Sequence, residues 1–184
     1  MYHSLYNLIK NGIIIAYFNH HNRRSNIMNI NFIHLIAFVF FIGGAAQAQF
    51  FGSDHTVRDV KTGVTWLRCS VGQAWNPDLK TCTGKIVKLN HDEIKIALEE
   101  AKRQLGGKWR LPSRSELMSL VCHDCAPPKI NTKYFPNLSS EAYWTADKNW
   151  LNPRTYWSVN FMTGHTYNRF FPYQRLPVLL VQDN

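Results

Sequence analysis

The sequence predicts an α+β fold that is stabilised by disulfides, with two helices followed by strands. Two segments before residue 122 carry apolar residues at helical spacing, whereas the segments after residue 140 are short apolar runs separated by Gly, Pro and Asn. The first pattern is typical of amphipathic helices and the second of strands. Because the two kinds of element are grouped along the chain, their order favours α+β over an alternating α/β array.

The clearer helix is predicted at residues 91–105. Asn90 is a suitable N-cap, and Asp92 and Glu93 follow in the first turn, where the helix dipole favours negative charge. Apolar residues recur at i, i+3, i+4 and i+7, and Gly106-Gly107 then ends the segment. The opposite side of this helix is charged, so one side is expected to face the core and the other the solvent.

A shorter helix is predicted from about residue 114 to residue 121. Ser113 and Glu116 have the S-x-x-E spacing of a capping box, in which each side chain bonds a backbone N–H at the helix start. Pro112 disfavours helix at the residue before it. The chain should therefore enter this helix in an extended conformation.

Strands are predicted on both sides of the helices. Residues 57–60 and 64–67 flank a Lys-Thr-Gly turn, and residues 49–56 before them are expected to be a ragged terminus. Gly164 provides the left-handed position of a hairpin loop at 162–164. After the helices, the predicted strands are 142–146, 156–161, 165–170 and a buried apolar strand at 177–181.

Residues 1–48 are expected to be an N-terminal extension and a secretory signal peptide. An uncharged apolar run at 32–44 follows the basic pair Arg23-Arg24 and precedes a small-x-small cleavage site that ends at Ala48. The run is shorter than the roughly 20 residues of a membrane span, so cleavage is preferred over a membrane anchor. Met28 is a candidate true start, because signal peptides normally begin close to their Met.

Residues 49–184 are then a single exported domain, in the periplasm, at the cell surface or outside the cell. They hold 18 of the 21 Lys and Arg and all 12 Asp and Glu, which gives a formal charge of +6. A positive charge of this size favours a polyanionic partner, and export argues against nucleic acid. The alternative is that the charge serves only solubility. No membrane span is expected after cleavage.

The four cysteines are predicted to form two disulfides, as is usual for an even number in an exported chain. Of the three possible pairings, the nearest-neighbour one is favoured: Cys69 with Cys82, which closes a long loop over 69–84, and Cys122 with Cys125. A zinc site is disfavoured because the first pair is thirteen residues apart rather than two to four. Cys122 and Cys125 have redox-motif spacing, but they follow a helix instead of opening one.

With these elements placed, the sequence resembles the C-terminal domain family of the Legionella collagen-like adhesin. The resemblance implies a C-type-lectin-like fold, a group that includes the formylglycine-generating enzymes, with two helices packed on a twisted antiparallel sheet and with adjacent terminal strands. The adhesin's collagen repeat and the paired calcium motifs of sugar-binding C-type lectins are absent, so no metal site is predicted. The matching segments are TGVTWLRCSVGQ (62–73), Cys82-Thr83-Gly84, KWRLPSRSEL (108–117), INTKYFPN (130–137), AYWTAD (142–147), YWSVNFMTGHTYN (156–168) and VLLVQ (178–182).

No catalytic constellation emerges from residues 49–184. Their four His lack partners at metal-ligand spacing and are expected at the surface, and there is no nucleophile elbow or phosphate loop. The chain is therefore predicted not to be an enzyme and to need no cofactor. Large aromatic rings dominate the burial of a small domain. The tryptophans expected in the core are Trp66, Trp109, Trp144 and Trp157.

The predicted ligand-binding residues are basic and aromatic groups on or beside the hairpin at 156–170. Alternation places Tyr167 and Arg169 on one face and Phe170 on the other, so the first two are exposed together if Phe170 is buried. An Arg beside aromatic rings suits sulfate or carboxylate groups, with ring stacking. The alternative is that the rings pack and the Arg residues only solubilise. The candidates are Arg154, Tyr156, His165, Tyr167, Arg169, Tyr173 and Arg175.

These observations predict an exported bacterial binding domain that acts in adhesion or surface recognition, with a polyanionic glycan as its ligand. The alternative is a structural or assembly subunit of the cell envelope, which binds envelope or host surface proteins and has no glycan site. An oxidoreductase acting through Cys122 and Cys125 is the third and least favoured hypothesis. The sequence predicts no particular oligomeric state.

Overall fold

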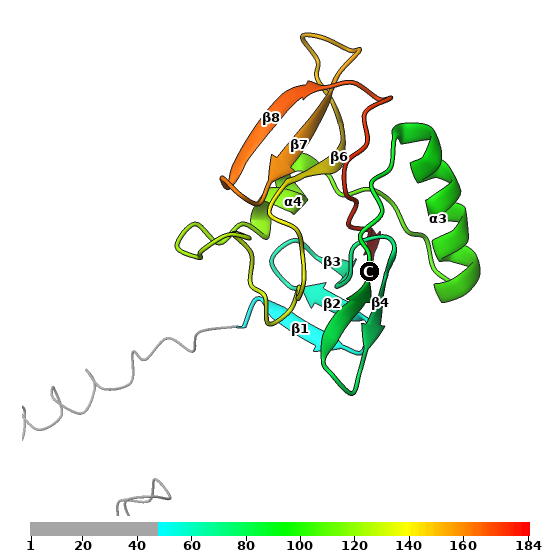
Figure 1. The fold of residues 1–184 in the computed structure, drawn as a ribbon, viewed down its shortest axis with the longest axis vertical. Helices are drawn as coiled ribbons and strands as arrows, with labels where there is room; N and C mark the ends of the chain where they lie inside the picture. The colour runs from blue at the N-terminus through cyan, green and yellow to red at the C-terminus, as the bar shows by residue number, and fades with distance from the viewer. Residues whose placement is uncertain (1–47) are drawn as a thin grey trace, which may run out of the picture. The chain divides into compact units, whose positions relative to one another are not determined.

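A computed structural model describes residues 48–184, so the predicted leader and Met28 lie outside the described residues except for Ala48. The described chain is α+β, with two helices, antiparallel sheets and two disulfides (Figure 1). No helix in this part of the chain is long and apolar enough to cross a bilayer. The helices are α3 (His91–Leu105) and α4 (Arg114–Ser119). The strands are β1 (Phe50–Ser53), β2 (Thr56–Asp59), β3 (Val64–Leu67), β4 (Gln73–Asn76), β5 (Thr81–Gly84), β6 (Ala142–Lys148), β7 (Tyr156–Asn160), β8 (His165–Phe170) and β9 (Val181–Asp183).

Both helices begin where the sequence predicts, and each begins with a capping box. The Asn90 side chain accepts a hydrogen bond from the Glu93 N–H, and the Glu93 carboxylate accepts one from the Asn90 N–H, both at 3.0 Å. Ser113 and Glu116 make the same exchange at the start of α4. This helix ends two residues earlier than predicted, because residues 120 and 121 already form its C-terminal turn.

The first sheet contradicts the expected ragged terminus at 49–56. Its strand order is β1-β2-β3-β9, and β1 pairs in register with β2. Phe50 is buried there, with its ring edge-on to Phe135 at 5.8 Å between centroids. The sequence alone does not show this strand, because its hydrophobic partner comes from a loop 85 residues further along the chain.

The C-terminal strand lies beside β3, so strands from the two ends of the domain share one sheet. This strand begins only at Val181, and the prediction of a strand over 177–181 was wrong in its bounds. Val178 to Leu180 are buried as predicted, but they bond to several different segments. The Leu180 carbonyl accepts from Leu67 and the Val178 carbonyl from Val71, at 2.9 and 3.0 Å.

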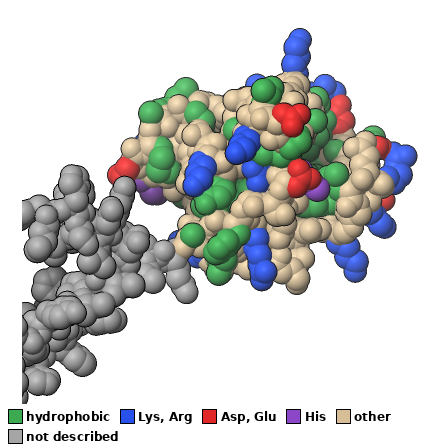
Figure 2. All heavy atoms as spheres, turned by 90° about the horizontal axis from the view of Figure 1, so that it is seen from below, with side chains coloured by type: hydrophobic (Ala, Val, Ile, Leu, Met, Phe, Trp, Pro, Cys, Tyr) green, Lys and Arg blue, Asp and Glu red, His purple; other side chains and the backbone are tan. Residues whose placement is uncertain are grey.

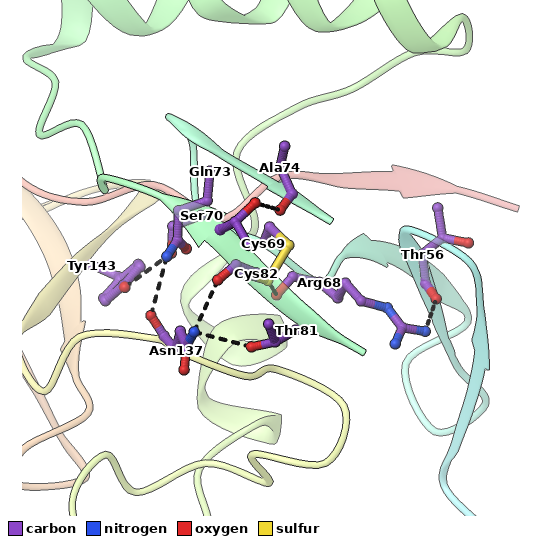
Figure 3. The surroundings of a disulfide bond; sticks show 11 residues. Thr56, Arg68, Cys69, Ser70, Gln73, Ala74, Thr81, Cys82, Asn137 and Tyr143 are labelled. Atoms are coloured by element: carbon purple, nitrogen blue, oxygen red, sulfur yellow. Dashed lines mark hydrogen bonds between the residues drawn. A yellow bond between two sulfur atoms is a disulfide. The ribbon is translucent and has the colours of Figure 1, made fainter. Parts of the chain in front are cut away.

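The segment expected to be a long loop over 69–84 is a two-stranded hairpin, β4–β5. The disulfide between Cys69 and Cys82 fixes its second strand to the end of β3 (Figure 3). Asn137 adds a further restraint, because its side-chain amide donates to the Cys82 carbonyl at 2.9 Å. The Asn-Pro-Asp signal at 76–78 therefore marks the turn of a hairpin. The second predicted disulfide, Cys122 to Cys125, is also present.

The third sheet, β6-β7-β8, packs against a core on each of its faces. Neighbouring residues of a strand point to opposite faces. Tyr143 joins Trp66 and Leu117 in the core beside α4, while Trp144 joins Trp109 in the core beside α3. Trp66, Trp109 and Trp144 are thus buried as predicted. The first part of β6 and the second half of β7 are therefore covered by the cores, whereas the edge strand β8 has no fully buried residue.

Arg110 connects the segment before α4 to the last strand. Its backbone exchanges two hydrogen bonds with Val181, at 2.8 and 3.0 Å. Its guanidinium makes two bonds of 2.9 Å to the Glu116 carboxylate and also pairs with Asp183. Because these bonds favour the charged carboxylate, they hold the pKa of Glu116 below its usual value of 4.5.

We predict that Glu116→Gln makes the domain less sensitive to acid. A carboxyl whose pKa is lowered by folding adds stability that is complete above its unfolded pKa, near 4.5, and is lost as pH falls through the lower folded pKa. Thermal melts should show the variant below the wild type at neutral pH, with a gap that closes as the pH falls below 4.5. Glu99→Gln, at an exposed and unpaired carboxylate of α3, is the control. A gap of constant size at every pH would contradict the prediction.

Candidate functional site

The structure does not bring the seven predicted ligand-binding residues together. His165 begins β8 at the hairpin-loop end, whereas Arg169 lies toward the other end of that strand. Arg175 forms an ion pair with Glu93 of α3. Tyr173 is exposed and stacks on Phe171, with 5.4 Å between ring centroids. His165 and Arg169 thus lie toward opposite ends of β8, and Arg175 is already engaged by α3.

Tyr156 packs instead of facing solvent. Its ring centroid lies 3.7 Å from that of His91 and 6.2 Å from that of Trp144. The expectation that all four His lie at the surface was therefore wrong for His91, which is half-buried between these rings. Burial lowers the pKa of His91 because it disfavours the charged imidazolium. This cluster belongs to the core beside α3.

Tyr167 and Arg169 do lie together. The Arg169 guanidinium is 5.0 Å from the Tyr167 ring centroid, and Arg169 is exposed. The register shifts between Tyr156 and Ser158, so β8 bulges at this point and departs from strict alternation. Phe170 nevertheless packs toward the core, 6.0 Å from the Trp144 ring.

The loop between β6 and β7 is held beside this pair by Asn149. The Asn149 side chain is 5% exposed; it donates to the Thr155 hydroxyl at 3.3 Å and to the Asn168 carbonyl at 3.4 Å. Its carbonyl oxygen accepts from the Leu151 N–H at 3.1 Å. The loop, at the top of Figure 1, is therefore fixed to β8 one residue before Arg169.

A hollow of about 240 Å³ opens between this loop and the start of α4. Trp150 is 80% exposed at its edge. Trp157 lines it as well and is half-buried beneath the Arg114 guanidinium, 4.2 Å from the ring centroid. The expectation that Trp157 is a core residue was wrong: it belongs to neither buried cluster and lies under Arg114 of α4, whereas its neighbour Tyr156 packs against the core beside α3. The lining residues are Arg114, Ser115, Asp147, Lys148, Trp150 and Trp157.

We call this region the loop-end surface. Arg114, Lys148, Trp150 and Trp157 line its hollow, and it also includes Arg154 and Arg169, which lie next to the two residues, Thr155 and Asn168, that Asn149 bonds. Within residues 48–184, none of its four cationic side chains forms an ion pair. The acid nearest to them in the hollow, Asp147, accepts a hydrogen bond from the backbone N–H of Arg114. The surface therefore offers free positive charge beside aromatic rings.

Sequence reasoning found Arg154 and Arg169 of this surface and missed the other four residues. Arg114 belongs to the segment that also carries the capping box, and its nearness to Trp157 depends on how α4 packs against β7. Trp150 carried a signal that could have been used: it is a large aromatic residue within a polar turn. Such a residue has few local partners to bury it.

Two larger hollows suit an anion less well. A groove of about 660 Å³ between α3 and the β4 hairpin has an apolar floor, and its charged lining residues include Asp54 and Glu100. A hollow of about 750 Å³ beside the Cys122–Cys125 disulfide is lined by apolar and neutral residues. Both hollows therefore lack the positive charge of the loop-end surface.

Comparison with known families matches residues 55–182 to the Lcl C-terminal domain. The chain belongs to this family. The match runs from just before β2 into β9 and includes both helices and both disulfides, so it covers the folded unit described above apart from β1 and the last two residues. The predicted family is thereby confirmed. No curated protein and no solved structure matched the chain, and the C-type-lectin-like fold stays a prediction.

We predict that Asn149→Ala loosens the loop between β6 and β7, which carries part of the loop-end surface of this Lcl C-terminal domain. Removing buried hydrogen bonds should cost about 1–3 kcal/mol of stability, because the partner groups lose their bonds without regaining water. Chemical denaturation measures this loss, and hydrogen exchange should quicken over residues 150–155. Asn152→Ala, in the same loop but exposed, is the matched control. Equal exchange in wild type and Asn149→Ala would show that Asn149 does not hold the loop.

Proposed function

We propose that this Lcl C-terminal domain is a non-catalytic binding domain of an exported bacterial protein, and that it recognises polyanionic glycans through the loop-end surface. The family membership and the two disulfides support an exported, adhesin-associated domain. The observation that carries the glycan proposal is a hollow in which Arg114 and Lys148, neither of which forms an ion pair within residues 48–184, lie beside the rings of Trp150 and Trp157.

The chemistry of these side chains fits sulfated or carboxylated sugars. A guanidinium offers a rigid fork of donors to the oxygens of a carboxylate or similar anion. The exposed Trp150 ring offers an apolar face on which a sugar ring can stack, and Lys148 at the end of β6 lines the same hollow. The formal charge of +6 on residues 49–184 adds a long-range attraction that draws such a polymer toward the domain.

An assembly function is the competing proposal, and one observation favours it. Leu151, beside Trp150, is 70% exposed, so the tip of the loop presents two adjacent apolar side chains. Exposed apolar groups of this kind are common at protein–protein contacts. A partner protein from the cell envelope or the host surface would then cover the loop, and no glycan would be needed.

We predict that the purified protein is retained on immobilised heparin and that retention falls steeply with salt. A triple variant should elute at much lower salt than the wild type: Lys148→Gln, Arg154→Gln and Arg169→Gln combined. It lacks three cationic side chains that would displace counterions from the heparin chain on binding. Arg175→Gln should change elution little, since Arg175 is already paired with Glu93.

The matched control is the triple variant Lys80→Gln, Lys85→Gln and Lys102→Gln. It removes the same charge from exposed lysines away from the loop-end surface. Equal losses in the two triple variants would mean that heparin binds by net charge alone, and the proposed surface would be wrong. Passage of the wild type straight through at low salt would instead favour the assembly function.

A further inference from the structure

Arg68 is a buried cation without an acidic partner. It follows β3, and only 7% of its surface is exposed. No carboxylate of residues 48–184 lies within 4.0 Å of its guanidinium. Its Nη2 donates to the Thr56 carbonyl at 3.0 Å (Figure 3), while its Nε is buried and has no hydrogen-bond partner among the described residues. A buried charge that is not paired is costly, so such an arginine points to a missing anion.

The guanidinium is held in place from two sides. It stacks on the Trp75 ring, with 4.0 Å between the guanidinium carbon and the ring centroid. On another side it lies against Gly52, where an added Cβ would come within 2.6 Å of Nη2. Asp54 contributes a favourable field, but its carboxylate is engaged with the His55 imidazole at 2.9 Å. The pKa of Arg68 is lowered by burial, as expected for a cation without a direct partner.

A pocket of about 420 Å³ opens beside this guanidinium. The Tyr134 ring and the guanidinium converge over Gly52, since both lie within 4 Å of the position of its absent Cβ. Lys133 brings a second cation, with its ammonium 5.6 Å from the Tyr134 ring centroid. Phe51 adds an exposed aromatic wall, and no acidic residue lines the pocket. Seen from below Figure 1, the described domain carries Lys and Arg side chains among apolar ones, with Asp and Glu side chains on the same face (Figure 2).

We propose that this pocket binds a small organic carboxylate with an apolar or aromatic body. Arg68 and Lys133 bind the carboxylate, and Phe51 and Tyr134 pack against the body. A planar guanidinium matches a planar carboxylate better than a tetrahedral anion, and the aromatic walls suit a ligand with an apolar part. The pocket is formed by β1, the end of β3 and the segment around residue 133, so it is separate from the loop-end surface and independent of glycan binding.

The test is calorimetric titration of the purified protein with phenylacetate. Three compounds serve as comparisons. Acetate lacks the apolar body, inorganic sulfate has a different anion geometry, and phenethylamine carries the opposite charge. Phenylacetate should bind, acetate and sulfate should bind more weakly, and phenethylamine should not bind. Sulfate binding as tight as phenylacetate binding would overturn the assignment to carboxylates, and binding of phenethylamine would overturn the role of charge.

Two variants locate the site. Arg68→Met keeps an apolar stem on Trp75 and should weaken phenylacetate about tenfold or more, the usual effect of losing a charge-assisted hydrogen bond. Lys133→Gln changes an exposed residue, so it keeps the proposal testable even if Arg68→Met fails to fold, and it should weaken binding about threefold or more. Lys102→Gln on α3 is the control and should bind as the wild type does. Unchanged binding in Lys133→Gln, or no binding to the wild type, would overturn the proposal.

Discussion

Arg110 connects the parts of the fold on which the loop-end surface depends. Its backbone pairs with Val181 of β9, and its guanidinium holds Glu116, whose carboxylate also caps α4. One side chain therefore sets the distance between the first sheet and the first turn of α4. Arg114 follows in that turn, and its N–H bonds the carboxylate of Asp147 in β6. The Arg114 guanidinium reaches Trp157 only because the helix starts at this place.

The β6-β7-β8 sheet explains why a binding surface forms at an end and not on a face. Tyr143 and Trp144 are both fully buried although they point to opposite sides of the sheet, because each faces its own core. The middle of the sheet is covered on both faces, whereas Trp157 of β7 is half-buried and Arg169 of the edge strand β8 is exposed. The bulge in β6 between Trp144 and Lys148 and the loop anchored by Asn149 place Lys148, Arg154 and the exposed Trp150 beyond both cores. The site is therefore a consequence of where the packing ends.

The sequence predicted the features whose signals are local. Both helix starts were correct because each capping box is complete within four residues, and the hairpin at 156–170 was correct because Gly164 marks its turn. The first strand was missed because Phe50 needs a distant ring to bury it, and Arg175 was misplaced because its partner Glu93 lies 82 residues away. The same limit applies to the site: the sequence places Arg169 on the hairpin, whereas the bulge in β8 and the contact of Arg114 with Trp157 depend on strand pairing and tertiary packing.

The most direct measurement is a two-dimensional NMR titration of the ¹⁵N-labelled protein with a short heparin oligosaccharide, following the indole N–H signals. The six tryptophans form an internal set of reporters: Trp150 and Trp157 lie on the loop-end surface, Trp75 lies beside Arg68, and the other three are buried. If the loop-end surface binds the glycan, the signals of Trp150 and Trp157 will shift with ligand concentration while those of Trp66, Trp109 and Trp144 stay in place. Shifts confined to Trp75, or no shift of Trp150 and Trp157 under conditions where the oligosaccharide binds, would contradict the account.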